Sequence, residues 1–269
     1  MMIHKAKKSM GQNFLKSEPA LRKMSEAGEV NNKDTILEIG PGKGALTSRL
    51  LLNAKKVIAI EKDNDLFEFL KEKYAENIKN GSLELVNGDI LEFEPKDYKL
   101  KKGEYKIIAN IPYNITGAIF KKFLSHENQP ERMVLLVQKE VAERVVARDN
   151  KESILSLSVK AYGTAKYEMK VHKRFFSPEP KVDSAIVSIT NISKDNFKKE
   201  GSEKNFFNII KAAFAHKRKV LRKNLEILEK NKGDIDDIFE KLEIDSKSRA
   251  EDIKIEKWLL ISDNLSTEI

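Results

Sequence analysis

Short apolar runs rich in β-branched residues alternate with amphipathic stretches through most of this 269-residue chain. Such alternation predicts a mainly parallel β-sheet whose faces are covered by helices. The expected strands are Thr35–Ile39, Val57–Ile60, Leu83–Val86, Lys106–Ala109 and Met133–Val137. The expected helices are Ala45–Leu52, Asp65–Tyr74, Ala118–Leu124, Val141–Val146 and Ser153–Tyr162.

The alternation stops in the last third of the chain. Tyr167–Val171 and Ala185–Thr190 have the composition of strands with no helix expected between them, so the sheet is predicted to finish with an antiparallel pair. Beyond Ser193 the sequence is polar and lysine-rich, with a break expected at Gly201-Ser202, and then helical. We predict an α/β domain over residues 1–193 and a small all-α domain over residues 194–269.

Composition excludes several classes of protein. No run of about 18 apolar residues suits a membrane span and no secretory signal is recognisable, so we expect a cytoplasmic protein without a membrane partner. The absence of cysteine excludes disulfides, thiolate metal sites and cysteine nucleophiles. The four histidines show no metal-ligand spacing, and no metal is expected.

The net charge of +8 is concentrated in two segments. Residues 1–23 hold six Lys and Arg against one acid, and residues 194–230 hold eleven against five acids. Basic segments that flank a near-neutral body suit nucleic acid, because neutralised phosphates release counterions. Lysine-rich surfaces that only keep a protein soluble look the same, so charge alone leaves both interpretations open.

A glycine-rich segment, Leu37–Gly44, connects the first expected strand to a helix. Glycine is required where a backbone turns tightly and approaches a ligand. The spacing Gly40-x-Gly42-x-Gly44 differs from the Gly-x-Gly-x-x-Gly of a dinucleotide loop, and Pro41 removes an N–H that a phosphate would use. The segment predicts either a loop with Gly40 and Gly42 against a ligand or only a tight turn.

Acidic residues follow the next two strands. A carboxylate at Glu61, the end of the second strand, can accept hydrogen bonds from both hydroxyls of a ribose. Asp89 follows the third strand and can accept a hydrogen bond from an adenine amine. Either acid alone is more often a solvated loop residue, but together with the glycine loop they predict one binding site at the carboxyl edge of the sheet.

The segment Asn110-Ile111-Pro112-Tyr113 ends the fourth strand. The N6 amine of adenine is a poor nucleophile because its lone pair is delocalised into the ring. The carboxamide oxygen of Asn110 and the carbonyl of Pro112 can accept both N–H protons and direct the lone pair at a methyl donor. Tyr113 can stack on the base, and no general base is required since positioning supplies the rate. A plain strand-ending turn is the alternative.

Four segments together resemble one family. Lys8–Leu15, Leu37–Gly44, Asn110–Thr116 and Phe175–Ser184 are similar, in order and spacing, to the ribosomal RNA adenine N6,N6-dimethyltransferases, most of all their small-subunit branch. The similarity runs from Lys8 to Leu225 and fades in the tail. It implies a Rossmann-like class I methyltransferase fold with a seven-stranded sheet and an antiparallel end strand, and S-adenosyl-L-methionine as cofactor.

The resemblance also implies residue roles. Asn13 and Leu15 would lie against the cofactor, Gly40 at its methionine portion, Glu61 on the ribose, Asp89 at the adenine amine, and Asn110 between donor and acceptor. Phe176 would face the target adenine opposite Tyr113, with Phe175 as the alternative. Members place two methyl groups on each of two adjacent adenosines near the 3′ end of small-subunit (16S) ribosomal RNA in a partly assembled particle, and we expect a monomer with this RNA as its partner.

A helix is expected over Asn205–Leu225, with its apolar residues at helical spacing. Its basic side chains would bind phosphates without contacting the bases. They are Lys211, Arg218, Lys219, Arg222 and Lys223. A solvated amphipathic helix is the alternative for this segment taken alone.

Rival functions remain open at this point. Ile111 is common in the large-subunit, macrolide-resistance branch, where the small-subunit enzymes usually have leucine, although one methyl rearrangement cannot decide a substrate. A DNA adenine methyltransferase is less favoured because no second domain large enough to read the major groove is expected. The other hypotheses are a ribosome-assembly checkpoint factor and a dehydrogenase with the same sheet.

Overall fold

The computed structural model describes residues 7, 10–216, 218–228 and 232–265. Lys8 and Ser9, at the start of the first family-like segment, lie outside the described residues.

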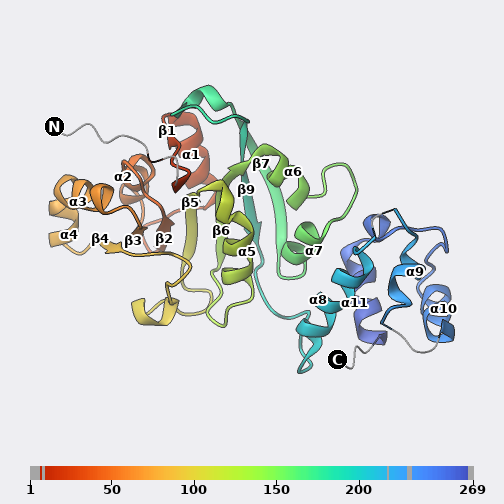
Figure 1. Cartoon of the computed structure of the whole chain (residues 1–269). Coiled ribbons are helices and arrows are strands. Elements are labelled where there is room, and N and C mark those ends of the chain that lie inside the picture. The colour runs from red at the N-terminus through yellow and green to blue at the C-terminus, as the bar shows by residue number, and fades with distance from the viewer. Residues whose placement is uncertain (1–6, 8–9, 217, 229–231, 266–269) are drawn as a thin grey trace. The chain divides into compact units, whose positions relative to one another are not determined.

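A seven-stranded sheet forms the centre of the first part of the chain (Figure 1). Its order is β4-β3-β2-β5-β6-β9-β7, and β9 runs antiparallel to both neighbours while β2 to β6 pair in parallel. The mainly parallel α/β fold is therefore confirmed, with the antiparallel strand one position in from the edge. The strands are β2 Thr35–Ile39, β3 Lys56–Glu61, β4 Leu83–Asn87, β5 Lys106–Asn110, β6 Arg132–Gln138, β7 Thr164–Val171 and β9 Ser184–Thr190.

Helices connect the parallel strands, as the sequence pattern predicts. They are α2 Ala45–Leu51, α3 Asn64–Lys73, α4 Ala75–Lys79, α5 Thr116–Leu124, α6 Lys139–Val145 and α7 Ile154–Lys160, with short 3-10 turns η2 Pro95–Tyr98, η3 Tyr113–Ile115 and η4 Lys173–Phe175. An additional helix, α1 (Glu18–Ala27), precedes the sheet. Ser17 accepts a hydrogen bond from the Ala20 backbone N–H and so caps α1.

Both faces of the sheet are buried. Ile36, Val57 and Ile108 belong to one continuous core that includes Met24 of α1 and Leu50 of α2. The alternate positions along the same strands point to the opposite face and are also buried, among them Leu37, Ile58, Ile107 and Leu135. Burial on both faces explains why these strands are continuous apolar runs, and it leaves the carboxyl edge of the sheet for polar groups.

A second, two-stranded sheet joins segments that are far apart in the sequence. β1 (Phe14–Leu15) pairs antiparallel with β8 (Phe176–Ser177), with Leu15 opposite Phe176. The Lys16 N–H also donates to the Phe175 carbonyl over 2.8 Å. Two of the four family-like segments are thus hydrogen-bonded to each other.

The chain divides into two compact units. Unit 1 comprises Met1–Ala142 and Thr164–Ile192, and unit 2 comprises Glu143–Gly163 and Ser193–Ile269. The division after Ile192 lies beside the boundary expected from the sequence, whereas Glu143–Gly163, expected within the α/β domain, groups with the helical unit.

Unit 2 is helical within its described residues. Beyond α7 its helices are α8 Ser202–Ala213, α9 Leu221–Leu225, α10 Lys232–Lys241 and α11 Ile255–Asn264, with a 3-10 turn, η5, at Ala250–Asp252. Tyr162 brings α7 against Phe197, with 5.4 Å between ring centroids, and Phe197 packs on Phe206 of α8. These aromatic contacts explain why residues 143–163 belong with the helical unit. No described helix has the length and apolarity needed to cross a bilayer.

The prediction of a single helix over Asn205–Leu225 is wrong. α8 ends at Ala213, and α9 begins at Leu221 after a turn. The Asn224 side-chain amide donates to the carbonyls of Ala213 and His216, 2.6 and 3.1 Å away, and so satisfies groups that a continuing helix would have paired. The break lets Phe214 pack on Trp258, with 6.1 Å between ring centroids.

Candidate functional site

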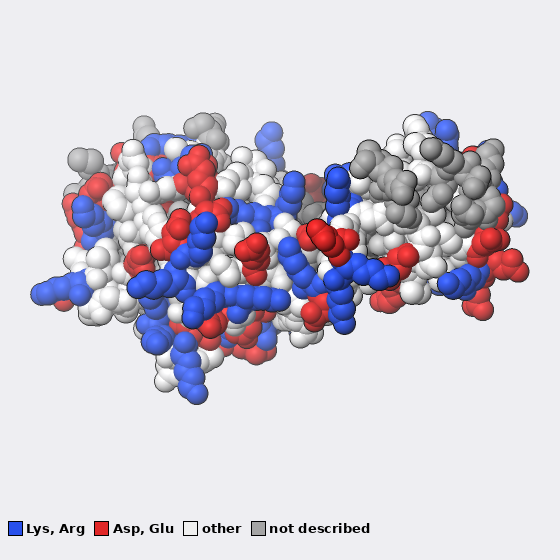
Figure 2. All heavy atoms as spheres, turned by 90° about the horizontal axis from the view of Figure 1, so that it is seen from below, with Lys and Arg blue, Asp and Glu red and all other residues white. Residues whose placement is uncertain are grey.

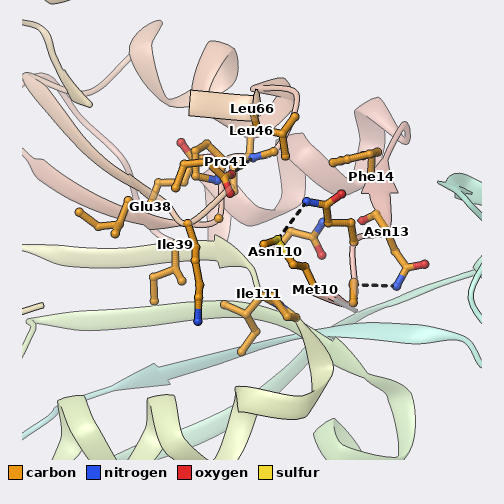
Figure 3. A pocket seen from close by; sticks show the side chains of 18 of the residues that line it. Met10, Asn13, Phe14, Glu38, Ile39, Pro41, Leu46, Leu66, Asn110 and Ile111 are labelled. Carbon is orange, nitrogen blue, oxygen red and sulfur yellow. Dashed lines mark hydrogen bonds between the residues drawn. The ribbon is translucent and has the colours of Figure 1, made fainter. Parts of the chain in front are cut away.

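A cavity of about 600 Å³ opens at the carboxyl edge of the sheet in unit 1 (Figure 3). Its wall is built from the N-terminal segment and from the loops after β2, β3, β4 and β5. The volume suits a small organic ligand. The expected site residues on the wall are Asn13, Leu15, Gly40, Gly42, Glu61, Asp89, Asn110, Pro112 and Tyr113.

Two glycines of the loop after β2, Gly42 and Gly44, have no room for a side chain, whereas Gly40 faces open space. Gly42 has φ +60°, and a Cβ there would lie 3.0 Å from the Phe14 ring. Gly44 has φ +77°, and a Cβ there would lie 2.5 Å from the Tyr74 hydroxyl. Positive φ and close neighbours together require glycine. The loop is therefore packed against the N-terminal segment on one side and α3 on the other.

Glu61 is held by backbone groups at the edge of the cavity. One carboxylate oxygen accepts from the Gly42 N–H at 3.0 Å, and the other accepts from the Asp63 N–H at 2.9 Å. Burial raises the pKa of Glu61, and these two hydrogen bonds oppose the increase. Each oxygen keeps a second lone pair, so the carboxylate can still accept two hydroxyl hydrogen bonds.

Asp89 is already engaged on both oxygens. It accepts from the Lys62 ammonium at 2.7 Å and from the Leu91 N–H at 2.9 Å. These hydrogen bonds lower the pKa of Asp89, so the group is a carboxylate at neutral pH. The Lys62 side chain is 65% exposed, so it can swing into solvent when a ligand amine approaches the carboxylate.

Glu38, on β2, was not predicted as a site residue. Its side chain lines the cavity, the residue is 1% exposed, and its Oε2 atom has no hydrogen-bond partner among the described residues (Figure 3). Burial raises the pKa of this carboxyl to about 8. This oxygen is therefore buried without a hydrogen-bond partner, which disfavours its ionised form.

Asn110 lies between the N-terminal segment and the end of β2 (Figure 3). Its side-chain N–H donates to the Asn13 carbonyl at 3.2 Å, and the Asn13 side chain in turn donates to the Gly11 carbonyl at 3.2 Å. This bond fixes the orientation of the Asn110 amide, and its oxygen accepts no hydrogen bond from the described residues, so it is available as an acceptor.

Tyr113 and Pro112 follow directly on the wall of the cavity. Pro112 has φ −58° and ψ 133°, which turns the chain out of β5 and into η3. Its carbonyl accepts a long bond, 3.3 Å, from the Ile115 N–H and keeps a second lone pair. The Tyr113 hydroxyl forms a 2.8 Å hydrogen bond with Ser184 of β9.

A cluster formed by Lys7, Gln12 and Asp63 ties the N-terminal segment to the start of α3, and the sequence reasoning missed it. Lys7 and Gln12 donate to the two Asp63 oxygens at 2.8 and 2.7 Å. Asp63 caps α3 by accepting from the Asp65 N–H at 3.0 Å, and its own N–H binds Glu61. An aspartate immediately before a helix is an N-cap signal, but nothing local pairs it with Lys7 or Gln12.

Phe176, which is expected to face the target base, is buried in this structure, and its role stays a prediction. Phe176 is 4% exposed, belongs to the core and does not line the cavity. Pairing with β1 turns its ring into the protein interior. Phe175 is 37% exposed and its ring lies 5.2 Å from the Arg174 guanidinium, but it too is outside the cavity wall.

The cations expected to bind RNA all lie in unit 2. Lys211, Arg218, Lys219 and Lys223 are exposed. Arg222 instead donates to both oxygens of Asp236, at 2.6 and 2.7 Å, and to Glu226 at 2.8 Å, so its guanidinium is used inside the unit. On the face shown in Figure 2, acidic and basic side chains are interspersed and form no uniform basic patch.

The cavity wall offers oxygens and apolar side chains. Within the described residues, no group of three or more His, Cys, Asp or Glu is arranged to hold a metal ion. Glu38, Glu61 and Asp89 stand at separate points of a wall that also contains Ile39, Leu46 and Leu66. This donor set fits an organic ligand with a ribose, an aromatic amine and a cationic end.

Comparison with known proteins identifies the family. The family model described as ribosomal RNA adenine dimethylase matches residues 3–267. This chain belongs to the ribosomal RNA adenine dimethylase family. The resemblance seen in the sequence is confirmed, and the protein is a methyltransferase of this family with a Rossmann-like fold.

Relatives of known name cover nearly the whole chain. A protein of Fusobacterium nucleatum named ribosomal RNA small subunit methyltransferase A is 40% identical over 96% of this chain and 97% of its own length. A protein of the same name from Dehalococcoides mccartyi is 39% identical over 94% of this chain and 86% of its own length. Membership of the family therefore does not depend on the fold alone.

Solved structures show the same fold. A dimethyladenosine transferase from Plasmodium falciparum is 28% identical, with a TM-score of 0.79 over 93% of this chain and 97% of that one. The 23S rRNA methyltransferase ErmE is similar in fold, with a TM-score of 0.78 at 24% identity over 94% of this chain and 99% of that one.

Proposed function

We propose that this protein uses S-adenosyl-L-methionine to dimethylate the N6 amines of two adjacent adenosines near the 3′ end of small-subunit (16S) ribosomal RNA, during assembly of the subunit. The names of the relatives, all at 35–40% identity, favour the small-subunit RNA over the large-subunit alternative. The observation that carries the chemistry is the Asn110 carboxamide, whose nitrogen is bound to Asn13 and whose oxygen is available in the cavity.

The cofactor would be held by residues of the cavity wall. Glu61 is positioned to accept the ribose hydroxyls, and Asp89 to accept the adenine amine once Lys62 moves away. Gly40 and Gly42 allow close approach of the methionine portion, and Asn13 and Leu15 cover it from the N-terminal side. When bound, the cofactor supplies an electrophilic methyl group on a sulfonium.

The protein's part in the reaction is to prepare the amine. Asn110 Oδ1 and the Pro112 carbonyl accept the two N–H protons, which draws the nitrogen lone pair out of conjugation with the ring. The lone pair would then point at the methyl group that a bound cofactor supplies; transfer would release the thioether, and the nitrogen's proton would pass to water. Tyr113 offers its ring to the base, and stacking of this kind contributes about 1–3 kcal/mol.

The C-terminal part of unit 2 would hold the RNA. We propose that residues 1–193 carry the cofactor and the reaction, and that residues 194–269 contact the ribosomal RNA through phosphates. The exposed cations Lys211, Arg218, Lys219 and Lys223 serve this role, and Arg222 is left out because its guanidinium is bound to Asp236 and Glu226. The enzyme would work as a monomer in the cytoplasm.

Methyl transfer to separate substrates tests the proposal. Radiolabelled S-adenosyl-L-methionine is supplied with small-subunit particles, large-subunit RNA or DNA, and the nucleosides are analysed after nuclease digestion. We expect dimethyladenosine in the small-subunit RNA only. Dimethyladenosine confined to large-subunit RNA or DNA would refute the substrate, and no dimethyladenosine in any arm would refute the activity.

Replacing Asn110 by alanine separates catalysis from a checkpoint role. Loss of the carboxamide oxygen is expected to lower kcat about 100- to 1,000-fold while particle binding remains. If assembly of the subunit proceeds normally with the inactive variant bound and released, the protein is chiefly an enzyme. Stalled assembly at unchanged binding would favour the checkpoint factor.

A further inference from the structure

Ser184 is a buried serine whose side chain touches the active-site tyrosine. It is fully buried at the start of β9, and its Oγ lies 2.8 Å from the Tyr113 hydroxyl. The bond connects the loop after β5 to a strand on the far side of β6 in the sheet order. Ser184 ends the family-like segment Phe175–Ser184, but the sequence assigns it no role, and it does not line the cavity.

The backbone around Ser184 is held on all sides. Ser184 pairs with Gln138 of β6 and with Val171 of β7. Its neighbour Asp183 accepts from the Lys139 N–H through its carbonyl and from the Lys173 N–H through its carboxylate, each at 3.0 Å. A hydroxyl placed on such a strand is a fixed point, because moving it would break the sheet ladder.

Tyr113 is consequently fixed at both ends. Its backbone carbonyl accepts from the Thr116 hydroxyl at 3.0 Å, and its phenol is bound to Ser184. The second contact restrains the Cα–Cβ torsion of Tyr113, because rotation about that bond would carry the phenol oxygen away from Ser184. Burial raises the pKa of Tyr113, so the phenol stays protonated and keeps the hydrogen bond at neutral pH.

We propose that Ser184 is a positioning residue that fixes the place of the Tyr113 ring beside the target base. The inference rests on the proposed function, because the place of the ring matters only if a base lies on it. A ring held in one place pre-orients the adenine for the Asn110 oxygen and the Pro112 carbonyl, which is where rate is gained. The role differs from stabilising the fold, since the bond joins two elements that other contacts already secure.

The variants Ser184→Ala, Tyr113→Phe and the double substitution test the role, with Ser188→Ala as matched control. Ser188 is on the same strand, 2% exposed, and donates to Glu168 at 2.8 Å instead of to the active site. Loss of one neutral hydrogen bond predicts about a tenfold fall in kcat for Ser184→Ala and for Tyr113→Phe. Because both remove the same bond, the double variant should be no slower than the slower single one.

Two further readouts distinguish positioning from a general structural effect. The affinity for S-adenosylhomocysteine and the urea midpoint of Ser184→Ala should match those of Ser188→Ala. A fluorescent purine analogue at the target position should show altered stacking in Ser184→Ala and not in Ser188→Ala.

Several results would overturn the proposal. These are equal activity of the two serine variants, multiplicative losses in the double variant, or a fall in cofactor affinity parallel to the loss of activity. Failure of the wild-type protein to make dimethyladenosine would remove the proposed function itself, and it is visible in the same assay before any variant is compared.

Discussion

Glu38 is expected to make the stability of this protein depend on pH. The carboxyl is buried on β2, and burial raises its pKa from 4.5 to about 8. In the unfolded chain the group ionises at its ordinary pKa. Between these two values the unfolded chain releases a proton that the folded protein retains, so stability falls as the pH rises through this window.

The Glu38→Gln substitution removes the titration and keeps the shape of the side chain. One pKa unit corresponds to about 1.4 kcal/mol, so the whole shift is worth about 5 kcal/mol of stability that is present below pH 4.5 and lost by about pH 8. From about pH 5 to pH 7, the free energy of unfolding of the wild type relative to the variant should fall by about 2–3 kcal/mol.

Urea unfolding of both proteins at several pH values measures this difference. Titrating groups that do not interact with Glu38 are present in both proteins and cancel in the comparison. Two parallel stability curves would show that Glu38 is ionised in the folded protein and that its environment is not the dry one described here. A wild-type curve that rises relative to the variant would show that a cation stabilises the carboxylate.

The remaining predictions concern the N-terminal cluster and the glycine loop. Asp63→Ala should release Lys7 and Gln12 and weaken the binding of S-adenosylhomocysteine, measured by calorimetry, about tenfold. Asp65→Ala is the control: it loses only the exposed contact with Lys7 and its own charge, and it should weaken binding less. Burial alone would raise the pKa of Asp63, but its hydrogen bonds from Lys7 and Gln12 lower it overall, so this contribution to stability is present above about pH 4 and lost as the pH falls further. Gly44→Ala should cost about 1–3 kcal/mol more than Gly81→Ala in urea unfolding, since both have positive φ but only Gly44 would place a Cβ against Tyr74. Equal costs for the two glycine variants would refute the packing described for the loop.

The local pattern of the sequence was sufficient for the sheet and for much of the cavity. The predicted limits of β2 agree with the structure, and those of β3 to β6 agree within a residue at each end. Parallel strands that are joined by helices all end on the same side of the sheet. This arrangement brings together Gly40, Glu61, Asp89 and Asn110 at one edge. These features depend on periodicity and connection, which neighbouring residues specify.

No local pattern in the sequence predicted the contacts between segments that are far apart in the chain. The pairing of Leu15 with Phe176 turned a predicted stacking residue into a core residue, and Asn224 ended a helix that its periodicity would have continued. The Lys7 to Asp63 and Tyr113 to Ser184 bonds likewise join side chains whose spacing follows no repeat.

The sequence by itself therefore determined the family, the sheet and the edge at which chemistry-bearing residues gather. Tertiary structure alone decided which of those side chains line the cavity, which form an ion pair with another residue and which are positioned by a hydrogen bond from outside the cavity. The physical reason is that burial and hydrogen bonding act through space, whereas sequence patterns record only what happens within a few residues along the chain.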